Sequence, residues 1–118
     1  MTTKEVADQL IKMCREGKVE EAKQEFFTDD TISIEPSEGI LHKETKGLKG
    51  IEKKAELFIS MVEHFYGHTI TEPVVAGDYF SVGWDTDIQM KGAERKRMDQ
   101  ICLYKVKDGK IVSEQFFY

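Results

Sequence analysis

The chain of 118 residues carries 17 basic and 22 acidic side chains, which gives a formal net charge of −5 at pH 7. This acidic balance argues against a nucleic-acid-binding surface and against binding to an anionic membrane. With 40% apolar and 33% charged residues, the composition predicts one globular domain over residues 1–118. A chain of this length can bury a core without a disulfide or a structural metal.

Cysteine usage and the N-terminal residues bear on localisation. Cys14 and Cys102 lie far apart and show no framework spacing, which favours a reducing compartment. The first ten residues contain no apolar signal core, and no apolar run is long enough to span a bilayer. We therefore expect a cytoplasmic protein with no membrane partner.

Two helices are predicted at the start of the chain. Apolar positions recur at helical spacing from Thr3 to Arg15, and again over the shorter segment from Val19 to Phe27. Thr3 is the expected N-cap of the first helix, and Gly17 is expected to end it.

A strand and the longest helix are predicted next. Residues Thr31 to Pro36 alternate and are rich in β-branched side chains, and Pro36 cannot donate to a strand ladder, so the strand ends there. The following segment is loop-like, with a short strand expected around Ile40 to Lys43. A helical stripe then extends from Gly47 to Tyr66, and Gly67 is expected to end it.

Four further strands complete the chain, with a tight turn at Asp108-Gly109. Their predicted ranges are His68–Ala76, Tyr79–Met90, Arg97–Val106 and Lys110–Tyr118. This order of elements predicts an α+β domain, with three helices from the N-terminal half packed on a curved antiparallel sheet.

The strand from Tyr79 to Met90 has one clearly apolar face, which carries Phe80, Val82, Trp84 and Thr86 and is expected to be buried. The last two strands are apolar on both faces, so side chains of the outer face need a separate explanation. Ile101, Leu103 and Phe117 belong to this outer set. One hypothesis is a homodimer formed through the outer sheet face, and the alternative is a local twist that buries these side chains.

Four segments together carry a family resemblance: FFTDDTISIEP (26–36), GLKGI (47–51), GDYFSVGW (77–84) and YKVKDGKIVSEQFFY (104–118). The chain resembles the SnoaL-like, nuclear transport factor 2-like superfamily, and within it ketosteroid isomerase. The resemblance implies a cystatin-like cone whose pocket lies on the concave face of the sheet, and frequent dimers. Members of the superfamily include isomerases, dehydratases, cyclases and binding proteins, so the fold leaves the chemistry open.

The similarity to ketosteroid isomerase implies a general base just before the strand-ending proline, and Glu35 holds that place. Strand alternation alone leaves its direction open, since Glu35 points outward if Ile32 and Ile34 face the helices. The oxyanion donors of that family would fall on Leu10 or Ile11 and near Cys102.

None of these three side chains is a good hydrogen-bond donor, so steroid isomerase activity is not expected. Glu114 is the second catalytic candidate, because a carboxyl group across the cavity from Glu35 would permit paired acid–base work. Its alternative is an outward strand position. The residues expected to line the pocket are Phe65, Phe80, Val82, Trp84, Thr86, Gln100, Cys102, Phe116 and Tyr118.

No metal or cofactor site is predicted. His64 and His68 have the spacing of helical metal ligands, but Gly67 lies between them. The sequence therefore favours a domain that binds an unidentified small, largely apolar molecule. One alternative is a cofactor-independent isomerase, dehydratase or cyclase that uses Glu35 as general base or acid. A second alternative is a dimerisation module without a ligand.

Overall fold

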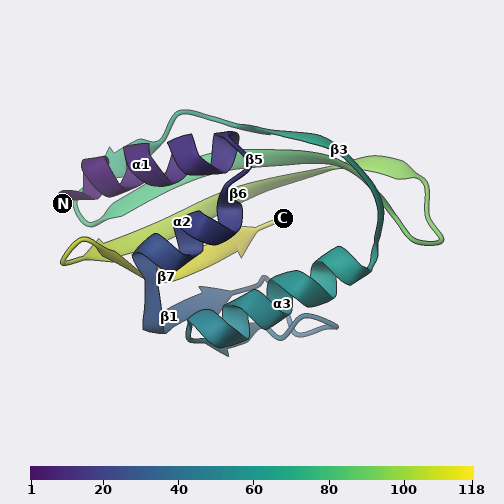
Figure 1. Cartoon of the computed structure of the whole chain (residues 1–118), viewed down its shortest axis with the longest axis horizontal. Coiled ribbons are helices and arrows are strands. Elements are labelled where there is room, and N and C mark those ends of the chain that lie inside the picture. Colours follow the sequence, from purple (N-terminus) through teal and green to yellow (C-terminus); the bar gives the residue numbers. More distant parts are fainter.

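The computed structural model describes residues 1–118, in which three helices pack against a strongly curved sheet of seven strands (Figure 1). The helices are α1 (Thr3–Arg15), α2 (Val19–Phe26) and α3 (Leu48–Ser60). The strands are β1 (Phe27–Ile34), β2 (Glu44–Lys46), β3 (Val62–Ile70), β4 (Val74–Ala76), β5 (Tyr79–Met90), β6 (Arg95–Lys107) and β7 (Lys110–Phe117).

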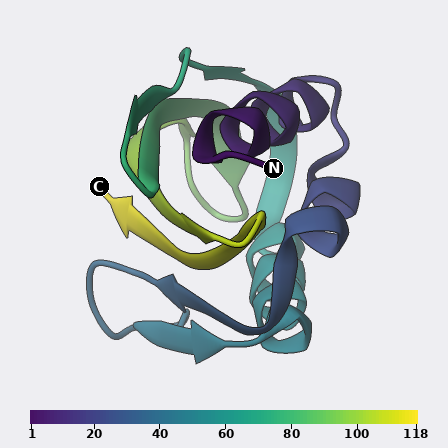
Figure 2. The same ribbon diagram turned by 90° about the vertical axis from the view of Figure 1, so that its left-hand side faces the viewer.

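The strands follow the order β2-β1-β7-β6-β5-β3, and β4 pairs with the other end of β5. Seen end-on, the sheet curls around one side of the molecule, and the helices close the other side (Figure 2). All pairs are antiparallel except β1 and β7, which are parallel. The predicted curved antiparallel sheet is therefore present, with one parallel pair that makes it mixed.

Helix α1 fills part of the concave face. It begins with a capping box in which the Thr2 side chain accepts from the backbone N–H of Glu5, at 3.1 Å, so the N-cap is one residue earlier than predicted. Its buried face packs on β5 and β6, where the rings of Phe80 and Tyr104 stack with centroids 4.8 Å apart. The centre of the hydrophobic core therefore lies between α1 and the middle of the sheet.

The predicted helix from Gly47 to Tyr66 is wrong in its last third. Helix α3 ends at Ser60, and the chain continues as β3, which pairs with β5 from Val62 to Ile70. Several residues of this segment are β-branched or aromatic, and the ladder with β5 satisfies its backbone N–H and C=O groups. The helical spacing of apolar residues past Ser60 is therefore coincidental.

Strand β1 turns its polar residues inward. Thr31 and Ser33 are fully buried and Glu35 is 6% exposed, whereas Ile32 and Ile34 are only partly buried. The interpretation in which the isoleucines face the helices is therefore wrong. Burial of these polar groups is tolerated because each has a partner; Thr31 Oγ1, for example, donates to the carbonyl oxygen of Ile111 at 2.6 Å.

The outer face of the sheet exposes a small apolar area. Ile101 and Phe117 are cross-strand neighbours, and their exposed fractions are 50% and 47%. The local-twist alternative therefore does not hold for these two side chains, and the dimer through this face stays a prediction. No helix of the chain is long and apolar enough to cross a membrane.

Gly47 fixes the start of α3 against β1. Its φ of 87° and ψ of 150° lie in a region that is essentially restricted to glycine. Its N–H donates to the carbonyl oxygen of Thr31 at 2.7 Å, and a Cβ at this position would lie 3.0 Å from the carbonyl oxygen of Asp29. The orientation of α3 thus depends on a residue without a side chain.

We expect Gly47→Ala to lower the free energy of unfolding by about 1–3 kcal/mol, because alanine is strained in this conformation. Urea denaturation followed by circular dichroism measures the change. Gly39→Ala is the control, because a Cβ at Gly39 meets no atom within 4 Å. Equal stabilities of the two variants would contradict this account of the helix start.

Candidate functional site

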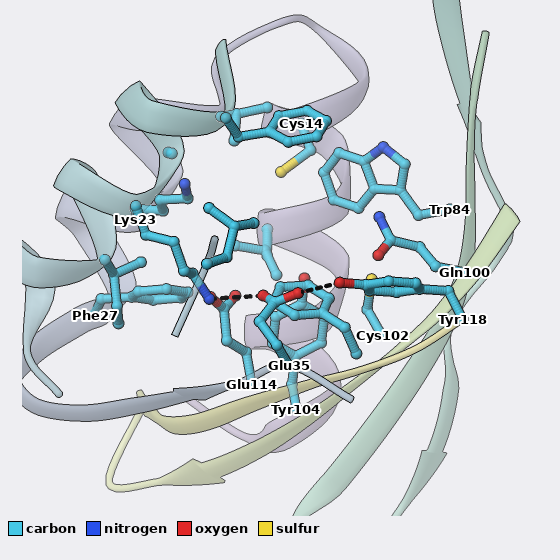
Figure 3. A pocket seen from close by; sticks show the side chains of 18 of the residues that line it. Cys14, Lys23, Phe27, Glu35, Trp84, Gln100, Cys102, Tyr104, Glu114 and Tyr118 are labelled. Atoms are coloured by element: carbon cyan, nitrogen blue, oxygen red, sulfur yellow. Dashed lines mark hydrogen bonds and ion pairs between the residues drawn. The ribbon is translucent and has the colours of Figure 1, made fainter. Parts of the chain in front are cut away.

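A cavity of about 240 Å³ lies between the helices and the concave face of the sheet (Figure 3). Fourteen of its nineteen lining residues are hydrophobic. The aromatic ones come from five different elements or their ends, and they are Phe27, Phe58, Trp84, Tyr104, Phe116 and Tyr118. The cavity is thus an apolar space with a few polar side chains in its wall.

Both predicted carboxyl groups, Glu35 and Glu114, line this cavity. Five of the residues expected in its wall are also there, namely Trp84, Gln100, Cys102, Phe116 and Tyr118. The chain therefore brings together, from β1, β5, β6 and β7, side chains that are up to 83 residues apart in the sequence.

Four of the expected lining residues lie elsewhere. Phe80 and Val82 are on the inner face of β5 as predicted, but α1 covers them, and they belong to the packed core. Phe65 is 58% exposed, because its segment is a strand and not part of α3. Thr86 lies one pleat further along β5 than Trp84, and it is outside the lining.

Glu35 is held by two donors at the end of β1. The ammonium of Lys54 donates to Oε2 at 2.7 Å, and the hydroxyl of Tyr118 donates to Oε1 at 2.6 Å (Figure 3). The side chains of Lys54 and Glu35 are only 11% and 7% exposed. Because this ion pair is buried and hydrogen-bonded on both carboxylate oxygens, the orientation of Glu35 is fixed.

Glu114 sits in a different environment from Glu35. It is 4% exposed, and its Oε1 accepts from the hydroxyl of Ser33 at 2.7 Å. Burial raises the pKa of Glu114, while the Ser33 hydrogen bond and the charges of Lys23 and Lys54 lower it in part. The protonated form of Glu114 is therefore favoured relative to an exposed carboxyl group.

Ser33 and Lys54 link the two carboxyl groups. Lys54 Nζ donates to Ser33 Oγ as well as to Glu35, and the Ser33 hydroxyl in turn donates to Glu114. The result is one connected chain of polar groups from Tyr118 at the rim to Glu114 inside. Each buried polar atom of this polar chain has a hydrogen-bond partner.

Sequence reasoning missed two cavity lysines, although a signal was present. Lys54 occupies the i+3 position of the buried helical stripe that starts at Ile51, and Lys23 occupies the i+4 position of the stripe that starts at Val19. A charged residue inside an apolar stripe is the pattern that could have identified both. Ser33 lies two residues before Glu35, on the same face of the strand, and its hydrogen bond to Glu114 was not predicted either.

The remaining polar groups of the cavity are unsuited to nucleophilic attack. Burial raises the pKa of Cys14 to about 11 and that of Cys102 to about 12, so both remain thiols at neutral pH. Burial and the hydrogen bond to Glu35 raise the pKa of Tyr118 to about 12, and its hydroxyl remains a donor. No group of three or more His, Cys, Asp or Glu side chains could hold a metal ion.

We expect Lys54→Met to lower the free energy of unfolding by about 3–5 kcal/mol, because it leaves the Glu35 charge buried without its partner. The measurement is urea denaturation at neutral pH. Adding Glu35→Gln to Lys54→Met should restore part of the loss, because the double variant carries no unpaired charge.

Lys53→Met is the matched control, since Lys53 is the exposed neighbour on the same helix. A double variant whose loss equals the sum of the two single losses would show that the two side chains are not energetically coupled.

We expect Glu114→Gln to become more stabilising as the pH rises from about 4.5 to about 8. Burial raises the pKa of Glu114 above 4.5 in the folded protein. The contribution of Glu114 to stability is therefore fully present at a pH below its unfolded-state pKa, and it is lost as the pH rises through its folded-state pKa. Thermal denaturation across this range measures the difference in Tm from the wild type.

Glu56→Gln, on the exposed side of α3, is the control and should show a difference that does not depend on pH in this way. A Glu114→Gln advantage that shrinks with rising pH would mean that the folded protein stabilises the ionised carboxylate.

Comparison with solved structures gives neighbours over nearly the whole chain. A Mesorhizobium loti protein, provisionally named a SnoaL-like polyketide cyclase, is 30% identical, with a TM-score of 0.93 and 100% of both chains covered. A Xanthomonas campestris protein with a cystatin-like fold is 18% identical (TM-score 0.83; 99% and 90% covered). A Catenulispora acidiphila protein with a ketosteroid isomerase-like fold, in complex with trimethylamine, is 19% identical (TM-score 0.75; 95% and 84% covered).

These neighbours confirm the predicted α+β class and the cystatin-like, nuclear transport factor 2-like fold. No curated protein matches the chain. The SnoaL-like domain family matches residues 1–118, which is the whole length. With the Mesorhizobium loti protein 30% identical over the same length, the resemblance inferred from four sequence segments is confirmed. The chain therefore belongs to the SnoaL-like domain family.

Proposed function

We propose that the cavity binds a small, largely apolar carbonyl compound, and that Glu35 transfers a proton to or from it. The single observation that carries this proposal is the placement of Glu35. Its carboxylate lies in the wall of a largely apolar cavity that also holds a second carboxyl group, Glu114. Cofactor-independent isomerases, dehydratases and cyclases all need such a proton-transferring side chain.

Size and polarity support a compact ligand. The cavity of about 240 Å³ is smaller than the roughly 300–1,000 Å³ that drug-sized ligands occupy. Trp84 and Phe116 supply flat apolar walls, and Gln100 offers an amide that can hold a carbonyl oxygen. A compound of one or two rings with a carbonyl group fits this description.

The two carboxyl groups suit different tasks. Glu35 forms an ion pair with the ammonium of Lys54, and the carboxylate of that pair is the form that a general base uses. Burial raises the pKa of Glu114 and so favours the protonated form that an acid requires. A proton taken from a carbon next to the ligand carbonyl would go to Glu35, and the electron pair would move to the carbonyl oxygen.

Binding without turnover is the second candidate function. The observation in its favour is that both oxygens of Glu35 already accept strong hydrogen bonds, from Lys54 and Tyr118. A base whose lone pairs are occupied is weaker, because the incoming proton competes with these donors. A domain of this kind would hold a metabolite and release it unchanged.

Hydrogen–deuterium exchange separates the two functions. The protein is incubated with 2-tetralone in D2O, and loss of the α-proton signal is followed by NMR. We expect the wild type to accelerate the exchange and Glu35→Gln to lower the protein-dependent rate by about 100-fold or more. Trp84 is the only tryptophan and lines the cavity, so its fluorescence reports binding separately.

Glu56→Gln is the control and should exchange at the wild-type rate, because Glu56 is exposed. Undiminished exchange by Glu35→Gln would exclude Glu35 as the base. Quenching of Trp84 fluorescence without accelerated exchange in the wild type would favour binding without turnover.

A further inference from the structure

Lys23 is a cation in the cavity wall that the network around Glu35 does not use. It lies on α2, its side chain is only 16% exposed, and it lines the cavity. The closest carboxylate oxygen is Oε1 of Glu20 on the same helix, at 3.6 Å, which is beyond hydrogen-bond distance. The side chain of Glu20 is 50% exposed, so this contact is weakened by solvent.

The other cavity lysine differs in this respect. Lys54 donates to both Glu35 and Ser33, so its ammonium is committed to the protein itself. Lys23 forms no comparable bond, and Figure 3 shows it on the wall opposite Trp84 and Gln100. Its N–H donors are therefore available to a molecule in the cavity.

The two lysines of the cavity wall differ in their acidic partners. Lys23 and Lys54 contribute two positive charges, and Glu35 contributes one negative charge that Lys54 compensates. Glu114 is the remaining acidic group of the wall; its Oε1 accepts from the Ser33 hydroxyl, and no ion pair joins it to Lys23. In a largely apolar space, an ammonium whose one ionic contact is a partly exposed carboxylate beyond hydrogen-bond distance attracts an anionic oxygen more strongly than it would in water.

We propose that Lys23 binds an ionised oxygen of the ligand, so that the cavity selects small ring compounds that carry a carboxylate, a phenolate or an enolate. The inference rests on the proposed function, and it names the class of ligand for the same cavity. It also gives the cavity a group that can stabilise an oxyanion, which the sequence alone did not predict. Leu10, Ile11 and Cys102 are not good donors to an oxyanion, whereas an ammonium donates hydrogen bonds and carries a positive charge.

The test compares two probes of nearly the same shape, 2-naphthoate and 2-naphthamide, at pH 7. Quenching of Trp84 fluorescence gives both dissociation constants, and calorimetry checks them. We expect the wild type to bind naphthoate about tenfold more tightly or better, because a hydrogen bond to a charged group contributes more than a neutral one. Lys23→Met should remove this preference and leave naphthamide binding within about twofold of the wild type.

Two further variants keep the test decisive. Lys23→Arg retains the positive charge and should retain the preference for naphthoate over naphthamide. This variant tests the role of the charge even where Lys23→Met folds poorly. Lys18→Met is the control, because Lys18 is 58% exposed and lies outside the cavity. It should bind both probes as the wild type does.

The outcomes distinguish this inference from the proposed function. Equal binding of the two probes by the wild type overturns the anion preference and leaves the pocket in place. A preference that survives in Lys23→Met assigns the cation to another residue and overturns the role of Lys23. Failure of the wild type to bind either probe overturns the pocket and the inference together.

Discussion

The ion pair between Glu35 and Lys54 is the interaction on which the site depends. It joins the end of β1 to the middle of α3 in a place that water scarcely reaches. An ion pair in such a place adds little net stability, because desolvation of the two charges offsets their attraction. Its main effect is to fix the position of α3 relative to the end of β1. Since either charge alone would be unfavourable, the helix and the strand are constrained to meet with these two side chains in register.

Other parts of the architecture follow from this constraint. Gly47 places the start of α3 next to β1, so the helix can direct Lys54 toward the strand end. The parallel pairing of β1 with β7 aligns Ser33 with Glu114, and these two residues form a hydrogen bond. Helix α1 covers the middle of the sheet. The cavity lies beside the polar chain, where apolar walls and charged groups meet.

The sequence predicted most of the fold because most of its elements have strong local patterns. The strand Tyr79–Met90 has the predicted bounds, and the helix from Thr3 to Arg15 does as well. The segment after Ser60 was misread as helix because pairing with β5 is a non-local interaction that a local window does not contain. Phe80 and Val82 were assigned to the correct face, but periodicity cannot say which part of a face a helix will cover.

The site was harder to predict than the fold. Glu35 was found through its place before Pro36, and its inward direction contradicts the simple rule that isoleucines point to the core. Lys54 and Lys23 were not predicted because a helical stripe predicts burial only for its apolar members, although a charged residue lies within each stripe. Their function arises from neighbours that tertiary structure supplies, so the residue types alone gave little indication of it.

The polar chain also has a consequence for folding. Ser33 and Glu114 are 81 residues apart in the sequence, and Glu35 and Tyr118 are 83 apart. Contacts between residues so far apart in the sequence form slowly, because a long loop must close before they contribute any stability. The helices and the β5–β6 hairpin are built from contacts closer in sequence, whereas the site requires these long-range contacts. A ligand of this cavity would therefore bind only chains in which the end of β1 has met the C-terminal residues, and its binding would stabilise the complete fold.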